Sequence, residues 1–453
     1  MTDSAANVAR VEHRDLLSAL FEEGVAAVGP GPLTEAAIAG LPLHTGQRVH
    51  VFALGKASRA MATAACTRLH RSLARVMGGL VVTPVSDDAS AIPPLDVIAG
   101  DHPHPGDRSL AAARRLGECA AGLTGDDVAL VLLSGGTSSL VAAPVNGVAP
   151  ADLRHLFALV DRAGLPIGEM NVVRKRLTRW GAGRLALALA PARTHVLAMS
   201  DVAGDDLADI GSGPCAPDRC TVADVVGLLR AAGLLERVPP AVRHYLEAVR
   251  RGDIPETPKP AHRAFARVTS AVIGTNRLAV DAIIAAGAAR GRSLERADRT
   301  LAGDAAACGA EIAQLLVSMA RDGVRGGIVW GGETIVVRQG ADAVAADGAG
   351  GTSLGGRCQE LALAAARVLA GAGDAGRRVT LLAAGTDGRD GPTDAAGAFA
   401  DATVWPAIVA AGVDPARALR QHDSYHALHA AGALLRRGPT GTNVMDVVIG
   451  LVE

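Results

Sequence analysis

Short apolar runs recur along the chain, and polar residues with glycine follow most of them. The first runs are residues 49–54 (VHVFAL), 79–83, 95–99, 128–133 and 194–199. Stretches with helical spacing lie between most of these runs. Because a strand, a glycine turn and a helix begin a βαβ unit, the pattern predicts an α/β fold with a doubly wound sheet.

A second set of runs follows a proline-rich stretch at residues 253–261. This stretch, DIPETPKPA, has three prolines and mixed charge, which is typical of a linker. The later runs are residues 268–273, 327–330, 334–337, 379–384 and 447–452. We therefore expect two domains, residues 1–255 and 262–453. The glycine- and alanine-rich residues 341–356 are expected to form a flexible excursion.

Composition limits the classes of function. The chain has 453 residues, a net charge of −1, 49% hydrophobic residues and 2% aromatic residues. An aliphatic core suits helix-covered parallel sheets, and the absence of a basic face argues against nucleic-acid binding. No signal peptide and no apolar run of ~18 residues are visible, which predicts a cytoplasmic protein that does not act on membranes. The six scattered cysteines are expected to be reduced. The sequence leaves open whether the protein forms a homo-oligomer.

Polar motifs at the ends of the predicted strands indicate a binding cleft. They are GKAS at 55, GDHPHPGD at 100, SGGTSS at 134, SDVAGDD at 200, GTN at 274, GGET at 331 and GTDGRDGPTD at 385. Parallel strands end at one edge of a sheet, where open α/β sheets bind their ligands. These motifs therefore predict a small-molecule site at that edge.

The SGGTSS loop is the best candidate for an anion site. Amides at a helix N-terminus, with hydroxyls beside them, bind phosphate or carboxylate, although a tight turn with a serine cap would look similar. The candidate binding residues are Ser134, Gly135, Gly136, Thr137 and Ser138. Neither this loop nor GKAS contains a Walker A motif or a G-x-G-x-x-G fingerprint, so neither supports a dinucleotide site.

Candidate cations come from three segments. Lys56 follows the first strand, where it is either a solvated lysine or a group that neutralises a transferring phosphoryl group. Arg357 lies at the start of a predicted helix, where a cation is unfavourable against the dipole, and this favours a functional role over a plain surface arginine. Asn171 and Arg174 belong to NVVRKRLTRWGAGR, which forms either a solvated basic face or a wall for an anionic substrate.

Candidate carboxylates follow two other strands. Asp201, Asp205 and Asp206 follow one strand and suit Mg²⁺, which favours one or two carboxylates together with substrate phosphates, although Asp205 or Asp206 could instead cap a helix. In the other loop Asp387 is the preferred carboxylate, because it lies nearest the end of the run 379–384. Asp390 and Asp394 are expected to shape the loop after residue 385. Three histidines at 422, 426 and 429 share one helical spacing, but packing or solvent roles are favoured over a zinc site because no further ligand pattern completes it.

With these residues in place, the chain resembles the glycerate 2-kinase family, whose C-terminal part is called the MOFRL domain. Eleven motifs in family order carry the resemblance: GKAS at 55, DHPHPGD at 101, LLSGGTSSL at 132, NVVRKRLTR at 171, SDVAGDDLADIGSGPCAPD at 200, GTNRLA at 274, GGET at 331, GGRCQELALA at 355, GTDGRDGPTDAAGA at 385, HDSY at 422 and GPTGTNVMD at 438. The resemblance implies a Rossmann-like N-terminal domain and a smaller α/β C-terminal domain, with the active site between them.

The resemblance also implies ATP-dependent phosphorylation of D-glycerate at O2, giving 2-phosphoglycerate, with a divalent cation. Lys56 and Arg357 match the family's catalytic pair. Asp201 is expected to act in catalysis or, with Asp387, to hold Mg²⁺. Further contacts to substrate or nucleotide are expected from the matching motifs, at Asn171, Arg174, Asn276, Glu333 and Thr386.

Departures from the family pattern leave the exact hydroxy acid and its stereochemistry open. They are Cys358, Arg176, the SGGTSS loop and the Gly181-Ala182-Gly183 turn. Two other functions remain as alternatives. An NAD(P)H-dependent hydroxypyruvate reductase is disfavoured by the missing dinucleotide fingerprint, and a non-enzymatic phosphosugar sensor is disfavoured by the carboxylate-rich second half.

Overall fold

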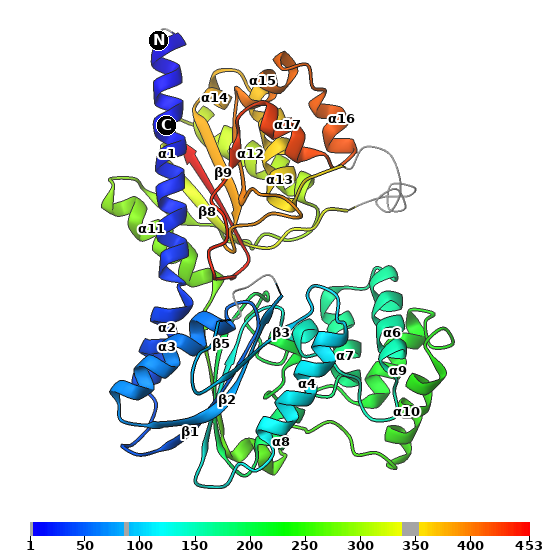
Figure 1. Ribbon diagram of the computed structural model, residues 1–453. Helices are drawn as coiled ribbons and strands as arrows, with labels where there is room; N and C mark the ends of the chain where they lie inside the picture. The colour runs from blue at the N-terminus through cyan, green and yellow to red at the C-terminus, as the bar shows by residue number, and fades with distance from the viewer. Residues whose placement is uncertain (1–2, 86–89, 338–352) are drawn as a thin grey trace. The chain divides into compact units, whose positions relative to one another are not determined.

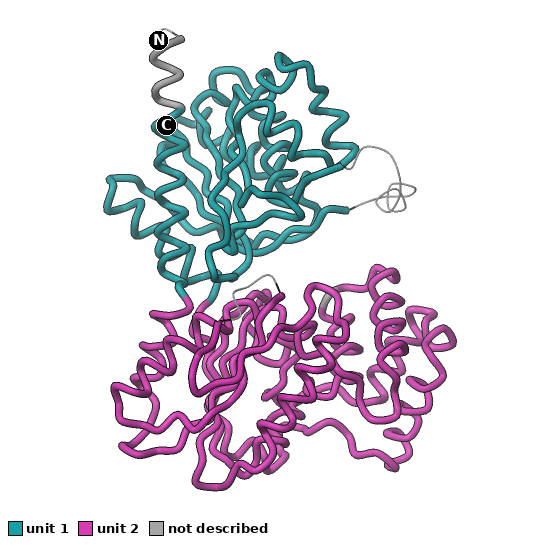
Figure 2. Tube along the Cα trace, in the orientation of Figure 1, with its two compact units in different colours: residues 1–29, 275–453 teal, residues 30–274 magenta. Residues whose placement is uncertain are grey.

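The chain forms two compact units in the computed structural model (Figure 2). The structure describes residues 3–85, 90–337 and 353–453. Residues 30–274 form one unit, here called the parallel-sheet unit. Residues 1–29 and 275–453 form the other, here called the mixed-sheet unit. Most of the excursion expected at residues 341–356 lies outside the described residues.

The parallel-sheet unit contains a six-stranded sheet in the order β3-β2-β1-β4-β5-β6 (Figure 1). All five strand pairs are parallel. The strands are β1 (Arg48–Leu54), β2 (Arg75–Pro84), β3 (Asp96–Gly100), β4 (Val128–Leu133), β5 (Arg193–Met199) and β6 (Val268–Gly274). The strand order reverses between β1 and β4, at the switch point where doubly wound sheets bind ligands. The predicted Rossmann-like sheet is thus confirmed.

Helices cover both faces of this sheet, which explains why its strands are almost continuously apolar. Phe52 and Leu54 of β1 join a core formed with α4 and α8, whereas the equally buried Val51 and Ala53 point to the opposite face. Four further helices pack around their own core. The helices of the unit are α2 (Pro30–Ala39), α3 (Ser58–Arg71), α4 (Asp107–Ala120), α5 (Thr137–Leu140), α6 (Pro150–Arg162), α7 (Ile167–Leu177), α8 (Arg184–Leu189), α9 (Val222–Ala231) and α10 (Pro240–Arg251), with 3-10 turns η1 (Ile210–Ser212) and η2 (Arg263–Arg267).

The division of the chain differs from the boundary expected at residues 253–261. This stretch lies inside the parallel-sheet unit, where Glu256 and Thr257 contact the buried side chain of Arg176. Beyond it, β6 still pairs with β5 in the parallel sheet. The prolines suggested a linker, but polar partners from distant α7 hold the stretch in place.

The mixed-sheet unit contains a second six-stranded sheet, in the order β11-β10-β9-β12-β8-β7. Only the β7–β8 pair is parallel among these described strands. The strands are β7 (Leu294–Arg296), β8 (Gly326–Gly332), β9 (Val379–Gly385), β10 (Gly397–Asp401), β11 (Leu434–Leu435) and β12 (Asp446–Val452). Because β12 runs antiparallel to β8 and β9, its first residue lies beside their last residues.

Helices also cover both faces of the mixed sheet. The N-terminal helix α1 places Leu17, Leu20 and Phe21 in a core with Ile283 of α11 and Leu382 of β9, which explains why residues 1–29 belong to this unit. Helices α12 and α13 pack together in the core on the other face. The helices of the unit are α1 (Asp3–Ala27), α11 (Asn276–Ala289), α12 (Ala305–Arg321), α13 (Arg357–Gly371), α14 (Asp374–Arg377), α15 (Val404–Ala410), α16 (Pro415–Arg420) and α17 (Ser424–Ala430).

The strand expected at residues 334–337 is absent from this described segment, where Ile335 forms only an isolated bridge with Asp304.

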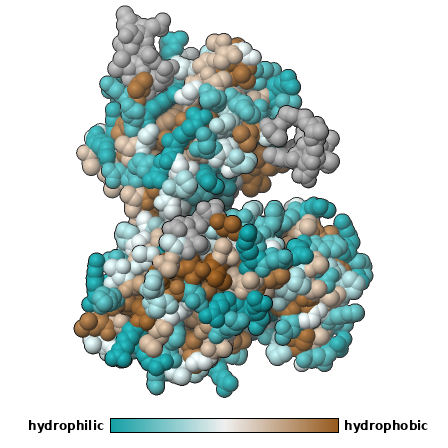
Figure 3. All heavy atoms as spheres, in the orientation of Figure 1, coloured by the Kyte–Doolittle hydropathy of each residue, from teal (hydrophilic) through white to brown (hydrophobic). Residues whose placement is uncertain are grey.

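Hydrophilic and hydrophobic residues are interspersed on the face drawn in Figure 3. Among the described residues, no helix combines the length and apolar character that a membrane span requires.

Candidate functional site

The loops after β1 and β4 contact each other at the switch point of the parallel sheet. The backbone N–H of Lys56 donates to the carbonyl of Gly135 at 2.8 Å. The next N–H, of Ala57, donates to Ser134 Oγ at 3.0 Å. A Cβ atom on Gly55 would lie 2.2 Å from Ser134 Oγ, and its φ of 122° also favours glycine. These contacts place Lys56 directly beside the SGGTSS loop.

Two hydroxyls of the loop are used within the protein. Thr137 Oγ1 donates to the carbonyl of Leu54 at 2.9 Å, and Ser134 accepts the Ala57 N–H. Both side chains are buried. They therefore hold the loop to the end of β1, as the alternative interpretation of SGGTSS as a tight turn predicts. The candidate groups for a ligand are the backbone N–H groups of Gly135 and Gly136 and the hydroxyl of Ser138, which also contacts the hydroxyl of Ser212.

Asp201 and His102 lie against the same loop. A Cβ atom on Gly135 would be 1.9 Å from Asp201 Oδ2, so glycine makes room for this carboxylate. A Cβ atom on Gly136 would be 3.0 Å from His102 Cδ2 and 3.3 Å from Lys56 Cγ. Burial, followed by the charges of Lys56 and His104, lowers the pKa of His102 to about 4. The edge thus combines a cation, a carboxylate and a neutral imidazole.

A cavity of about 350 Å³ lies next to this edge. Helix α7 contributes Asn171 and Arg174, three residues apart and therefore on one helical face. Ser138 contributes its hydroxyl, which lies 2.7 Å from the hydroxyl of Ser212. Arg174 pairs with Asp161, and its buried Nε has no hydrogen-bond partner among the described residues. Polar groups in a small cavity suit a small polar ligand.

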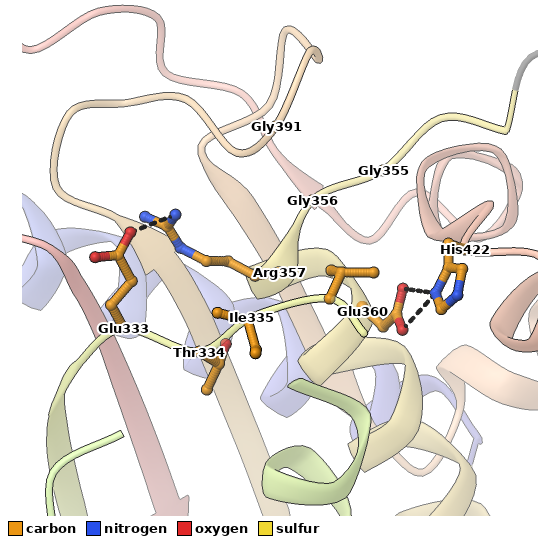
Figure 4. A pocket seen from close by; sticks show the side chains of 10 residues that line it. Glu333, Thr334, Ile335, Gly355, Gly356, Arg357, Glu360, Gly391 and His422 are labelled. Carbon is orange, nitrogen blue, oxygen red and sulfur yellow. Dashed lines mark hydrogen bonds and ion pairs between the residues drawn. The ribbon is translucent and has the colours of Figure 1, made fainter. Parts of the chain in front are cut away.

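In the mixed-sheet unit, Arg357 is the first residue of α13 and contacts two carboxylates. Its Nε and Nη2 donate to the carboxylate of Asp446, with Nη2 and Oδ1 2.9 Å apart. Its Nη1 lies 2.6 Å from Glu333 Oε1 (Figure 4). Burial works against the charged guanidinium, but the hydrogen bonds and charge of Asp446, together with the charge of Glu333, raise the pKa of Arg357.

Asp387 and Asp390 have different surroundings. A Cβ atom on Gly385 would lie 3.2 Å from Asp387 Oδ1 and 3.3 Å from Asp446 Oδ1, so these two carboxylates converge at the end of β9. Asp390 is buried and accepts the backbone N–H groups of Cys358 and Gln359 at the start of α13. Among the described residues, no group of three or more His, Cys, Asp or Glu side chains could hold a metal ion by itself.

The structure gives Asn276 and Thr386 supporting contacts. Asn276 Nδ2 donates to the carbonyls of Val444 and Asp446, and Thr386 Oγ1 donates to the carbonyl of Met445. Both side chains are buried. They therefore hold the turn that leads into β12, and their expected contact with substrate or nucleotide stays a prediction.

A second cavity, of about 330 Å³, opens beside Arg357 and Glu333 (Figure 4). His422 and Glu360 also line it, and His422 Nδ1 lies 2.9 Å from Glu360 Oε1. The three histidines of the sequence pattern have separate partners, since His426 contacts Asp423 and His429 contacts Arg436. His422 also precedes α17 and is not on its face.

Asp446 and the Glu360–His422 pair were not singled out from the sequence. One signal was available for Asp446, because a lone carboxylate directly precedes the apolar run 447–452. Such a residue opens a buried strand and requires a partner there. The sequence pattern places His422 in the histidine trio, but no local signal pairs it with Glu360, which is 62 positions away.

Comparisons with known proteins agree with this architecture. Residues 16–247 match the family described as "Domain of unknown function (DUF4147)", and residues 326–446 match the MOFRL family. A D-glycerate 2-kinase of Thermotoga maritima is 35% identical over 416 residues, covering 91% of this chain and 92% of the relative. A chain of Agrobacterium vitis, provisionally named hydroxypyruvate reductase, is 34% identical over 446 residues, covering 96% of this chain and 94% of the relative.

A solved structure also matches along the whole chain. The crystal structure of a glycerate kinase from Thermotoga maritima has a TM-score of 0.83 and 33% sequence identity, and the match covers 98% of this chain and 100% of that chain. The motifs, the two matching domains and the shared fold agree. The chain therefore belongs to the glycerate 2-kinase family.

Proposed function

We propose that this protein transfers the γ-phosphoryl group of ATP to O2 of D-glycerate, giving 2-phosphoglycerate. The observation that carries the proposal is the position of Lys56 at the switch point, beside the SGGTSS loop and Asp201. The named activity of the Thermotoga maritima relatives supports the same reaction. Phosphoryl transfer needs positioning and charge stabilisation, which a lysine and oriented amides supply.

The cavity of the parallel-sheet unit is the proposed glycerate site. Its volume of about 350 Å³ suits a three-carbon acid with room for water. Asn171 and Arg174 would bind the glycerate carboxylate, and the Ser138 hydroxyl would bind a substrate hydroxyl. The backbone amides of Gly135 and Gly136 then face the transferring group, and Lys56 neutralises its charge.

In the mixed-sheet unit, the Arg357 guanidinium is proposed to contact a phosphoryl oxygen, and Glu333 is proposed to lie near the nucleotide. Asp201 and Asp387 are the proposed Mg²⁺ ligands, because Mg²⁺ uses one or two carboxylates together with substrate phosphates. When bound, the ion would neutralise phosphate charge. Asp201 is also the proposed acceptor for the proton of the 2-hydroxyl.

One assay series separates this function from its alternatives. With Mg·ATP, the protein is expected to release ADP only when D-glycerate is added. L-glycerate and longer aldonic acids in the same assay define the substrate class. A hydroxypyruvate reductase would instead oxidise NADH when hydroxypyruvate is added. A sensor would be thermally stabilised by a phosphosugar without any turnover. Absence of glycerate-dependent ADP release would refute the proposal.

The reductase alternative lacks a structural feature that it requires. In a dinucleotide-binding sheet, the turn after the first strand is glycine-rich and approaches the pyrophosphate closely. Here the single Gly55 is packed against Ser134 of the neighbouring loop.

A cytoplasmic location stays a prediction, and homo-oligomerisation stays open.

A further inference from the structure

The two carboxylates that contact Arg357 differ in their surroundings. The side chain of Asp446 is 3% exposed, whereas that of Glu333 is 42% exposed. Asp446 also makes two parallel hydrogen bonds to the guanidinium, a geometry that fixes its plane. A partly exposed ion pair contributes less stability than a buried, bidentate one. Arg357 thus has one buried, bidentate partner and one partly exposed partner.

The backbone that carries Asp446 is held on several sides. Asn276 Nδ2 donates to the carbonyls of Val444 at 2.8 Å and Asp446 at 2.9 Å. Thr386 Oγ1 accepts the N–H of Val444 at 2.9 Å and donates to the carbonyl of Met445 at 2.6 Å. Asp446 itself is the first residue of the central strand β12 and pairs with β8 and β9.

Met445 adopts an unusual conformation directly before this aspartate. Its φ is 69°, in the left-handed region that residues other than glycine rarely occupy. Such a conformation persists only where the surroundings enforce it, and it is most common at functional sites. Here the bonds from Thr386 and Asn276 enforce it. The strained turn and the bidentate pair are therefore two observations that lead to the same residue.

We propose that Asp446 is a positioning residue for phosphoryl transfer. It fixes the guanidinium of Arg357 through Nε and Nη2 and leaves Nη1, which Glu333 occupies here, to contact a phosphoryl oxygen. This inference rests on the proposed kinase function. It assigns no contact between Asp446 and substrate, because the carboxylate is buried behind the arginine.

The first test compares Asp446→Asn with Asp374→Asn. Asp374 is a matched control, since it also pairs with an arginine but its side chain is 97% exposed. Loss of orientation at a catalytic group can lower turnover about 100-fold, so we expect Asp446→Asn to lower kcat by about that factor while KM for D-glycerate changes less than about threefold. Asp374→Asn should retain kcat. A kcat of Asp446→Asn within threefold of wild type would overturn the inference.

Chemical rescue separates positioning from a general loss of folding. Arg357→Ala should regain part of its turnover when guanidinium chloride is added at millimolar concentration, because Asp446 can bind the free cation. The double variant Arg357→Ala/Asp446→Asn should not respond. Equal rescue of both variants would overturn the inference, because the carboxylate would then contribute nothing to orientation.

A resonance measurement keeps the inference testable apart from activity. In ¹⁵N-labelled protein, the Nε–Hε signal of Arg357 is the one that disappears in Arg357→Lys. We expect the chemical shift of its proton to lie downfield of those of solvated arginines and to move upfield in Asp446→Asn. If wild type shows no glycerate-dependent turnover, the proposed function fails, while this signal still reports the arginine–aspartate geometry. A signal unchanged by Asp446→Asn would contradict the positioning itself.

Discussion

Arg176 and Asp218 form an ion pair inside the parallel-sheet unit, with Nη2 and Oδ2 3.1 Å apart and 1% of each side chain exposed. The same guanidinium donates to the carbonyl of Cys220 at 2.7 Å and also contacts Glu256. It therefore ties α7, which carries Asn171 and Arg174, to two distant segments of the unit.

We expect Asp218→Ala to destabilise the protein strongly. Removal of Asp218 leaves Glu256 as the carboxylate partner of the buried guanidinium. Breaking a buried ion pair in this way costs about 3–5 kcal/mol. Asp253→Asn is the control, because Asp253 pairs with Arg251 at the surface and should change the free energy of unfolding by less than about 0.5 kcal/mol. Urea unfolding measures both. A loss below about 1 kcal/mol for Asp218→Ala would contradict a structural role for the pair.

Substitution of Gly135 should separate the loop geometry from general stability. A Cβ atom there would lie 1.9 Å from Asp201 Oδ2, so Gly135→Ala must displace either the loop or the carboxylate. Because a misplacement of about 1 Å can lower turnover about 100-fold, we expect a loss of that order in kcat. Gly227→Ala is the control, since nothing lies within 4 Å of its Cβ position in α9. It should retain turnover and stabilise the helix by about 0.5–1 kcal/mol. Steady-state kinetics that show equal kcat for both variants would contradict the proposed geometry.

Asp390 should make stability depend on pH. Burial, followed by the charge of Asp446, raises the pKa of Asp390 to about 7. In the unfolded chain the pKa is about 3.9, so the folded protein binds this proton more tightly. The resulting stabilisation is complete below about pH 4 and is lost as the pH rises through about 7.

Asp390→Asn cannot titrate and should remove this contribution. The free energy of unfolding of wild type, measured with urea between pH 4 and 8, should fall with pH by up to about 1.4 kcal/mol per unit more steeply than that of the variant. Asp394→Asn, an exposed loop residue, should follow the wild-type curve. Parallel curves for wild type and Asp390→Asn would show that Asp390 does not hold this proton.

Lys56 should act on turnover through its charge. Lys56→Met keeps most of the side-chain length but removes the cation beside the SGGTSS loop, where Lys56 Cγ lies 3.3 Å from the Cβ position of Gly136. Loss of one electrostatic contact to the transferring group lowers kcat by about 100- to 1,000-fold. Arg115→Ala removes a surface cation of α4 that pairs with Asp96, and it should leave kcat unchanged. Near-normal turnover of Lys56→Met in a coupled ADP assay would refute the proposed role of Lys56 in phosphoryl transfer.

Much of the fold could be predicted from the sequence because local patterns specify it. The run 128–133 is apolar at every position, and the run 49–54 is apolar at every position except His50. The structure buries the apolar side chains of both runs, on both faces of the sheet, as β4 and β1. The division into units could not be predicted in this way. It depends on contacts of α1 with α11 and of residues 253–261 with Arg176, which are distant in the chain and leave no local pattern.

The candidate site was predictable at its strand ends and less so in its supporting contacts. Lys56 and Asp201 follow strands of a parallel sheet, so topology alone brings them to one edge. Two of these contacts depend on side-chain packing between distant positions. The Thr137 hydroxyl donates to the carbonyl of Leu54, 83 positions away, and Asn276 supports residue 446, 170 positions away. Spacing along the chain carries no information about such contacts.

The position of the transferred phosphoryl group distinguishes a glycerate 2-kinase from an enzyme that phosphorylates O3. Purified protein, Mg·ATP and D-glycerate are incubated, and the product is passed to enolase, which accepts 2-phosphoglycerate but not 3-phosphoglycerate. We predict stoichiometric formation of ADP and of phosphoenolpyruvate, with ³¹P NMR confirming the 2-phosphoglycerate precursor before enolase is added. Formation of 3-phosphoglycerate, or no phosphorylated glycerate at all, would show that the protein does not phosphorylate D-glycerate at O2.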